Sequence, residues 1–419
     1  MDKIIINGGK KLYGKVKISG AKNAALPILF ATMLTDEECT IENVPHLVDI
    51  KTACALLEFF GKKIKIEGDK ISIHTIKIPH KPEAPYELVK KMRASFLIAG
   101  ALLSRFGYAR ISMPGGCAIG VRPVDIHLYG LKKLGAKISI DGGYLTLRTK
   151  RLKGTVINLS YPSVGATENL LIAATLSYGK TIIKGAAREP EIADLSNFLN
   201  SIGANIKGIG TKNLTVTGVK KLNACPSYKI IPDRIETGTF LIAGAITKGV
   251  LEIQNCNPGH ISLLINLLKE AGFSIRNNKT SIKIKYKGRK IKAVSITTAP
   301  YPGFPTDLQA QWMALMTTAN GESVIRETVF ENRFMHVGEF QRLGAELKIK
   351  GDTVIIRGAH LTGAPIMVSD LRAGASLILA GLVADGITTI ERVYHIDRGY
   401  ENIEAKLFLL GADIRRIKD

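Results

Sequence analysis

The sequence predicts an α/β protein of two domains, each made of three similar units in which strands alternate with helices. Three observations support this prediction. A glycine ends a helix-like apolar segment six times, at intervals of about 70 residues, each time before a strand-like segment with tight-turn signals. Strongly apolar segments of helical length lie between these repeats. The unit is too long for a solenoid, and a single α/β array is the alternative. The repeated glycines are Gly61, Gly135, Gly203, Gly272, Gly344 and Gly411.

Each repeated glycine is expected to end an amphipathic helix, because glycine adopts the left-handed conformation at a helix C-terminus without a Cβ penalty. The segments that follow alternate apolar and polar residues and contain hairpin signals at Gly68, Gly142 and Gly351. A helix followed by a β-hairpin is therefore the second half of each unit.

The apolar segments predict a second kind of helix, since a helix that is apolar on all sides is buried. Each unit then reads as strand, buried helix, strand, amphipathic helix, strand, strand, with the buried helices inside and the sheets outside. These segments include residues 96–103, 170–176, 240–246 and 377–383.

Composition excludes several classes of protein. Of 419 residues, 46% are hydrophobic, which is enough for large cores and argues against disorder. The longest apolar runs are far shorter than the about 20 residues of a membrane-spanning helix, so no membrane insertion is expected. The N-terminus has no secretory signal, and the five cysteines form no C-x-x-C pair. We therefore expect a reducing, cytoplasmic setting, no metal site and no cofactor.

The formal charge of +22 allows two interpretations, a nucleic-acid partner or a basic surface with a pocket for anionic substrates. Aromatic residues make up only 6% of the chain, and no nucleic-acid-binding motif is present. The densest basic stretch is residues 276–292, and within it Lys283, Lys285 and Lys287 alternate with apolar residues, as in a strand with one solvated face. We predict small anionic ligands and no nucleic acid.

Polar residues collect at the expected starts of the buried helices, where unpaired N–H groups carry partial positive charge. Thr167, Glu236 and Gln309 are expected to cap their helices. A cation at the same place opposes the helix dipole unless an anion compensates it. Three cations lie at such expected helix starts, so the sequence predicts a phosphate or carboxylate ligand there. If the repeats pack with threefold symmetry, the helix starts converge, and two facing domains enclose a positive cleft. The cations are Lys22, Arg93 and Arg372.

Residues 113–123 contain three glycines, two prolines, Cys117 and Arg122, which is typical of a surface loop. A nearby cation lowers the pKa of a thiol and makes it more reactive. The loop therefore predicts a functional thiol at Cys117, with a bystander thiol as the alternative.

The sequence resembles the enolpyruvyl transferase family over the whole chain, from Lys22 to Arg398, and most specifically in five motifs. The resemblance implies an inside-out α/β barrel in two domains, residues 22–229 and residues 1–21 with 230–419, with the active site in the cleft between them. The motifs are residues 114–127, 163–167, 304–309, 331–336 and 370–374.

The resemblance also implies a reaction, the first committed step of peptidoglycan precursor synthesis. The enolpyruvyl group of phosphoenolpyruvate moves by addition and elimination to the 3′-hydroxyl of UDP-N-acetylglucosamine, and phosphate leaves. Lys22, Arg122 and Arg398 would hold the phosphate and carboxylate of phosphoenolpyruvate. Asp307 would accept the hydroxyl proton, and either Cys117, the site that fosfomycin alkylates, or Lys22 would protonate the vinyl carbon.

Further residues match substrate-binding positions of the family. Some members have lysine where this chain has Val48 and Tyr161, so nucleotide binding here would depend on other residues. The oligomeric state and feedback control stay open. The alternatives are the shikimate-pathway relative, which lacks the cysteine loop, and a non-catalytic protein that binds nucleotide sugar. The matching positions are Asn23, Arg93, Arg122, Pro123, Val124, Asp125, His127, Ser163, Val164, Gly165, Asp307, Val329, Asp370 and Arg372. Glu189, like Asp370, matches a polar position that lines the cleft of the family.

Overall fold

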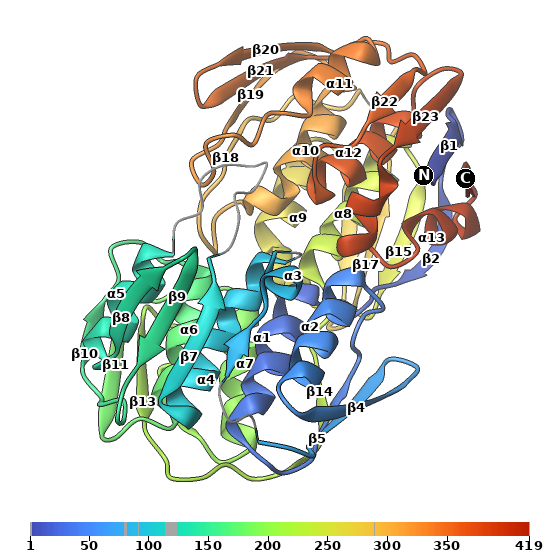
Figure 1. The fold of residues 1–419 in the computed structure, drawn as a ribbon. Coiled ribbons are helices and arrows are strands. Elements are labelled where there is room, and N and C mark those ends of the chain that lie inside the picture. Colours follow the sequence, from blue (N-terminus) through green and yellow to red (C-terminus); the bar gives the residue numbers. More distant parts are fainter. Residues whose placement is uncertain (1, 79–81, 91, 114–123, 289, 419) are drawn as a thin grey trace. The chain divides into compact units, whose positions relative to one another are not determined.

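The computed structural model describes residues 2–78, 82–90, 92–113, 124–288 and 290–418 (Figure 1). The described residues form two compact units. The N-terminal unit lies between Gly20 and Ile231, and the C-terminal unit combines the segment before Gly20 with the residues from Pro232 onward. None of the helices in these ranges is long and apolar enough to cross a membrane.

The N-terminal unit contains short strands and helices that alternate along the chain. Its strands are β3 (Cys39–Glu42), β4 (Lys62–Glu67), β5 (Lys70–Thr75), β6 (Glu83–Ala84), β7 (Tyr108–Ser112), β8 (Lys137–Asp141), β9 (Tyr144–Arg148), β10 (Val156–Asn158), β11 (Lys180–Lys184), β12 (Asn205–Lys207), β13 (Asn213–Thr217) and β14 (Cys225–Lys229). Its helices are α1 (Lys22–Ala31), η1 (Thr32–Leu34), α2 (Val48–Phe59), α3 (Tyr86–Val89), η2 (Arg93–Leu97), α4 (Ile98–Phe106), α5 (Asp125–Lys133), α6 (Val164–Thr175) and α7 (Pro190–Ser201).

The C-terminal unit repeats this alternation. Its strands are β1 (Lys3–Asn7), β2 (Tyr13–Lys17), β15 (Val250–Gln254), β16 (Ser274–Asn277), β17 (Ser281–Lys285), β18 (Ile296–Thr297), β19 (Glu322–Arg326), β20 (Glu346–Lys350), β21 (Thr353–Arg357), β22 (Pro365–Met367), β23 (Ile387–Glu391) and β24 (Asp413–Ile417). Its helices are α8 (Arg234–Ile246), η3 (Pro258–Ile261), α9 (Ser262–Glu270), η4 (Thr306–Leu308), α10 (Gln309–Met316), α11 (Val337–Arg342), α12 (Leu371–Gly381), η5 (Val393–Arg398) and α13 (Ile403–Leu409).

The described strands form six four-stranded sheets, three in each unit, and the sheets share one plan. In the order β10-β11-β13-β12, the first pair is parallel and the other pairs are antiparallel. Five sheets close with the hairpin that follows a repeated glycine, and all six of these glycines have φ between 85° and 107°. The sixfold repeat, the helix-ending glycines and the α/β fold class are therefore confirmed.

The sixth sheet has the order β22-β23-β1-β24 and contains no hairpin made of two consecutive strands among those described. The N-terminal strand β1 takes the place of a hairpin strand and pairs antiparallel with both β23 and β24. The next strand, β2, pairs parallel with β15 of another sheet in the same unit.

The apolar helices lie inside each unit, as the sequence predicts. Helices α1, α4 and α6 pack against one another, and so do α8, α10 and α12 (Figure 1). Close packing explains the small residues within these apolar helices. A Cβ built at Gly100 of α4 would lie 2.2 Å from Oδ1 of Asn169 on α6, so a larger residue cannot fit there without a shift.

Candidate functional site

A charged centre lies where α10 and α12 begin in the C-terminal unit. The carboxylate of Asp307, on η4, accepts hydrogen bonds from two guanidinium groups. Arg372 in the first turn of α12 donates from Nη2 to Oδ2 at 2.9 Å, and Arg333 donates from Nη2 to Oδ1 at 3.1 Å. Both arginine side chains are about 95% buried, whereas the Asp307 side chain is 26% exposed. The carboxylate is therefore the member of the centre that solvent or a ligand can reach.

Arg372 keeps its charge although it is fully enclosed. Burial alone would lower its pKa, but the charge of Asp307 and further interactions with Tyr400 and Asp233 outweigh burial, and the pKa of Arg372 is raised. Its guanidinium also lies 5.5 Å from the ring centre of Tyr400. One nitrogen, Nη1, is buried with no hydrogen-bond partner among the described residues. The interaction with Asp233, the N-cap of α8, shows that the starts of α8, α10 and α12 converge.

Three α-helix starts in the described ranges are capped by side chains, but not by the residues that the sequence predicted. Oδ1 of Asp233 accepts hydrogen bonds from Ile235 N and Glu236 N, and Asp370 and Ser163 cap α12 and α6 in the same way. The expectation that Thr167, Glu236 and Gln309 cap their helices is wrong.

These three residues lie within their helices and not at the N-cap positions, and their side chains have other surroundings. Thr167 donates to Ser163 O and accepts from Ala187 N. Glu236 is bound by Lys406 at 2.6 Å. Gln309 is fully buried, and its amide has no hydrogen-bond partner within the ranges described.

His336 extends the charged centre toward Asp370. Burial lowers the pKa of His336 to about 4, and the charge of Arg333 acts in the same direction, whereas Asp370 opposes it. The imidazole is therefore neutral near pH 7, and it packs edge to face on Phe340. The sequence motif contained His336 and Arg333, but only the fold shows that Arg333 binds Asp307.

Sequence reasoning missed Glu327, which orders the segments on both sides of Asp307. Its side chain is buried after β19 and accepts four hydrogen bonds. Oε1 accepts from Thr298 Oγ1 at 2.8 Å, Val329 N at 2.8 Å and Phe330 N at 3.2 Å, and Oε2 accepts from Thr306 Oγ1 at 2.8 Å. The signal was present in the alternation of β19, which places Ser323, Ile325 and then Glu327 on the buried side.

In the N-terminal unit, Lys22 is the first residue of α1, and its side chain is only 12% exposed. Its Nζ lies 3.6 Å from Oδ2 of Asp49, in the first turn of α2. This carboxylate offsets part of the cost of a buried cation at a helix start, whereas the sequence alone predicted that a ligand would supply the compensating anion. Asn23 follows on the same turn and is partly buried, and Arg93 begins η2, which leads into α4.

A second group surrounds the start of α6. Asn169 is fully buried, and its Nδ2 lies 3.2 Å from Nδ1 of His127 on α5. Its Oδ1 accepts from Gly100 N at 2.8 Å, so Asn169 links α4, α5 and α6. The imidazole of His127 also faces Gly165, where a Cβ would lie 3.3 Å from the ring. The fold thus brings together His127 and the segment from Ser163 to Gly165.

The other predicted site residues lie on separate segments. Val124 and Asp125 begin α5, Val164 begins α6, and Glu189 precedes α7 and is buried. Val329 follows β19, and Arg398 ends η5. Val48 and Tyr161, which replace lysines of some relatives, are both exposed. Cys117, Arg122 and Pro123 lie outside the described residues.

Comparison with known proteins identifies the class that this fold and site define. The sequence profile of the EPSP synthase (3-phosphoshikimate 1-carboxyvinyltransferase) family matches residues 6–407. The chain belongs to this family of enolpyruvyl transferases, so the resemblance seen in the sequence is confirmed.

Particular relatives narrow the comparison. The chain is 55% identical to the UDP-N-acetylglucosamine 1-carboxyvinyltransferase of Endomicrobium trichonymphae and 53% identical to that of Cellvibrio japonicus, over the full length of each. Among solved structures it resembles the enolpyruvyl transferase NikO from Streptomyces tendae, with a TM-score of 0.90 and 26% identity over 100% of this chain and 99% of the other. EPSP synthase from Acinetobacter baumannii shares the fold, with a TM-score of 0.78 and 17% identity over both full chains.

Proposed function

We propose that the chain transfers the enolpyruvyl group of phosphoenolpyruvate to the 3′-hydroxyl of UDP-N-acetylglucosamine and releases phosphate. Relatives at 50% identity or more, matched over the whole chain, carry the name of this activity. The observation that carries the proposal is the partly exposed carboxylate of Asp307, which is held between two buried guanidinium groups at converging helix starts.

The reaction proceeds by addition and then elimination. A proton adds to the CH₂ carbon of phosphoenolpyruvate, C2 becomes electrophilic, and the sugar oxygen bonds to C2 as its proton leaves. The tetrahedral intermediate then loses phosphate from C2 and a proton from the new methyl group. We propose Asp307 as the acceptor of the hydroxyl proton. The hydroxyl becomes strongly acidic as the C–O bond forms, so a carboxylate, although a weak base, suffices.

The remaining roles belong to the same proposal. Lys22, Arg122 and Arg398 hold the charges of phosphoenolpyruvate, with Arg93 and Arg372 in support, because two anionic substrates must be held together. Cys117 or Lys22 delivers the proton to the vinyl carbon. In this proposal, residues 22–229 and the rest of the chain form two domains that act on the same substrates.

The proposal includes a cytoplasmic setting for the reaction. It rests on the sequence, whose five cysteines are widely spaced and form no C-x-x-C pair.

Phosphate release tests the proposal. The protein with phosphoenolpyruvate and UDP-N-acetylglucosamine should release phosphate, whereas shikimate 3-phosphate should not replace the nucleotide sugar. If phosphate is released with shikimate 3-phosphate as the acceptor and not with UDP-N-acetylglucosamine, the protein catalyses the reaction of the shikimate-pathway relative instead. Nucleotide-sugar binding without release from either acceptor would indicate a non-catalytic binding protein.

Asp307→Asn separates catalysis from binding. It keeps the shape and removes the base, so turnover should fall by about 100-fold or more. Binding of UDP-N-acetylglucosamine, measured by calorimetry, should persist. Asp385→Asn is the matched control, because Asp385 is exposed and pairs with His360. Full turnover in Asp307→Asn would refute the role of Asp307.

A further inference from the structure

A pocket of about 490 Å³ lies in the N-terminal unit at the opposite ends of the buried helices from Lys22, Arg93 and Ser163. It is formed where η1, α4 and α6 end, together with the segments after β9 and β13. A 12-residue helix such as α6 is roughly 18 Å long, so this pocket is distinct from the candidate site. Its volume falls within the range of pockets that bind small metabolites.

The pocket combines an apolar floor with a cationic rim. The floor is largely aliphatic and buried, and the rim carries more positive than negative side chains. Asp36 is the one carboxylate that lines the pocket among the described residues, and it is bound by Arg105. The leucines are Leu34, Leu103, Leu176 and Leu222, and the cations are Arg105, Lys150, Arg151, Lys220 and Lys221.

Cations at helix C-termini can simply complement the helix dipole, so this explanation must be weighed first. Arg105 fills that role, because its Nη1 donates to Met33 O at 2.7 Å and Thr35 O at 3.2 Å. Lys62 donates to the same Thr35 O at 2.7 Å. At the end of α6, Ser104 Oγ donates to Ala173 O at 2.8 Å. The helix ends thus have their own donors, and the rim cations are in excess of what the dipoles require.

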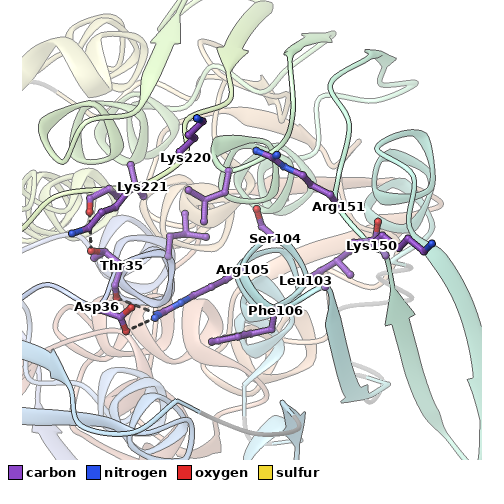
Figure 2. A pocket seen from close by; sticks show the side chains of 15 residues that line it. Thr35, Asp36, Leu103, Ser104, Arg105, Phe106, Lys150, Arg151, Lys220 and Lys221 are labelled. Atoms are coloured by element: carbon purple, nitrogen blue, oxygen red, sulfur yellow. Dashed lines mark hydrogen bonds and ion pairs between the residues drawn. The ribbon is translucent and has the colours of Figure 1, made fainter.

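The excess cations are Lys150, Arg151 and Lys220. No carboxylate pairs with any of them among the residues that the structure describes. Arg151 lies over the ring of Tyr178 and extends toward the side of the pocket where Lys220 lies, whereas Lys150 points away (Figure 2). Lys221 is exposed and pairs with Glu37.

A further cation, Lys62, lies next to the pocket residue Thr35. Burial lowers the pKa of Lys62 to about 8, and the charge of Arg105 lowers it further in the same direction. Burial is the larger cause of this shift, and Arg105 contributes as a second positive charge beside Lys62.

We propose that this pocket binds a small organic phosphate, with the phosphate between Arg151 and Lys220 and the apolar body on the leucine floor. The dianionic charge of a phosphate matches one guanidinium and one ammonium group, and the aliphatic floor favours a body with an apolar face. This site is separate from the enolpyruvyl transfer proposed above.

The probe is 1-naphthyl phosphate, which joins an aromatic body to a phosphate and is fluorescent. The protein should bind it at least about tenfold more tightly than inorganic phosphate or 1-naphthol, because each of these offers one half of the match. Arg151→Gln combined with Lys220→Gln should weaken binding about tenfold or more. Lys283→Gln combined with Lys285→Gln is the matched control, since both lysines are exposed on β17 and carry the same charge. The control should bind as the wild type does.

Ser104→Cys locates the bound probe. Ser104 lines the pocket, so iodoacetamide should label the new thiol, and 1-naphthyl phosphate should slow labelling at residue 104 as read by peptide mass spectrometry. The proposal is overturned if binding is unchanged in the Arg151 and Lys220 variant, if the control loses as much affinity, or if labelling at residue 104 is not slowed at saturation. Equal binding of 1-naphthol would overturn the role of the phosphate.

Discussion

Glu327→Ala tests whether one buried carboxylate orders the surroundings of Asp307. The substitution removes the acceptor of four hydrogen bonds from Thr298, Thr306, Val329 N and Phe330 N. A buried donor without a partner costs about 1–3 kcal/mol. Water that enters the vacated space restores part of this, so the free energy of unfolding should fall by about 3–5 kcal/mol.

Glu327→Gln is the matched variant. The amide oxygen can still accept from the donors that meet Oε1, and the hydroxyl of Thr306 can rotate to accept from the new NH₂ group. Only the charge assistance of the bonds is lost, which is worth about 1–2 kcal/mol.

Urea unfolding and phosphate release together measure the effect. Because Thr306 precedes Asp307 directly, Glu327→Ala should also lower kcat by about tenfold or more at temperatures where the variant is folded. Glu327→Gln should keep most of the turnover. The positioning role would be refuted if Glu327→Ala and Glu327→Gln were equally active and their free energies of unfolding both lay within about 1 kcal/mol of wild type, as for a substitution at an exposed site.

Two further predictions concern the N-terminal unit. Asn169→Ala should lower the free energy of unfolding by about 2–4 kcal/mol, because it leaves Gly100 N without an acceptor and opens a cavity. It should also raise KM for the nucleotide sugar, because His127 loses its contact with Asn169. Urea unfolding and initial rates measure the two effects, and an unchanged stability would contradict the assigned bonds. Burial raises the pKa of Asp194 to about 6, although Tyr228 donates a hydrogen bond to this carboxyl. The folded protein therefore binds the Asp194 proton more tightly than the unfolded chain does. The stability that the bound proton contributes at low pH is lost as pH rises from about 4 through 6. Asp194→Asn removes this titration, so relative to wild type its unfolding free energy should improve by about 2–3 kcal/mol between pH 4 and 7, and a pH-independent difference would show that the carboxyl does not titrate this way.

Much of the fold could be predicted because short stretches of sequence determine where its helices end and where its strands lie. The positive φ of Gly61 and of its five counterparts follows from the helix ends that they occupy, and the alternation around Lys283 gives a strand with a solvated face. The sixth sheet could not be found this way. Its hairpin place is filled by β1, which comes from the other end of the chain, and no local pattern encodes which distant strand completes a sheet.

The candidate site divides along the same line. Lys22 and Arg372 stand out in the sequence because a cation at a helix start is unfavourable by itself. Their partners depend on tertiary packing: Asp49 comes from the next helix along the chain, and Arg333 reaches Asp307 from a different segment. Glu327 escaped notice because a lone acidic residue after a strand is usually exposed, and only its inward position reveals its role.

Because β1 pairs with both β23 and β24, the sixth sheet cannot form until these late strands have been synthesised. Strand β1 leaves the ribosome well before β23 and β24, whereas the segment from Gly20 to Ile231 can already collapse while translation continues. During that interval β1 is an unsatisfied edge that a folding helper or a neighbouring nascent chain could capture. A chain cut short by even its final strand would keep that edge open, so truncated products should be prone to aggregation and to proteolysis.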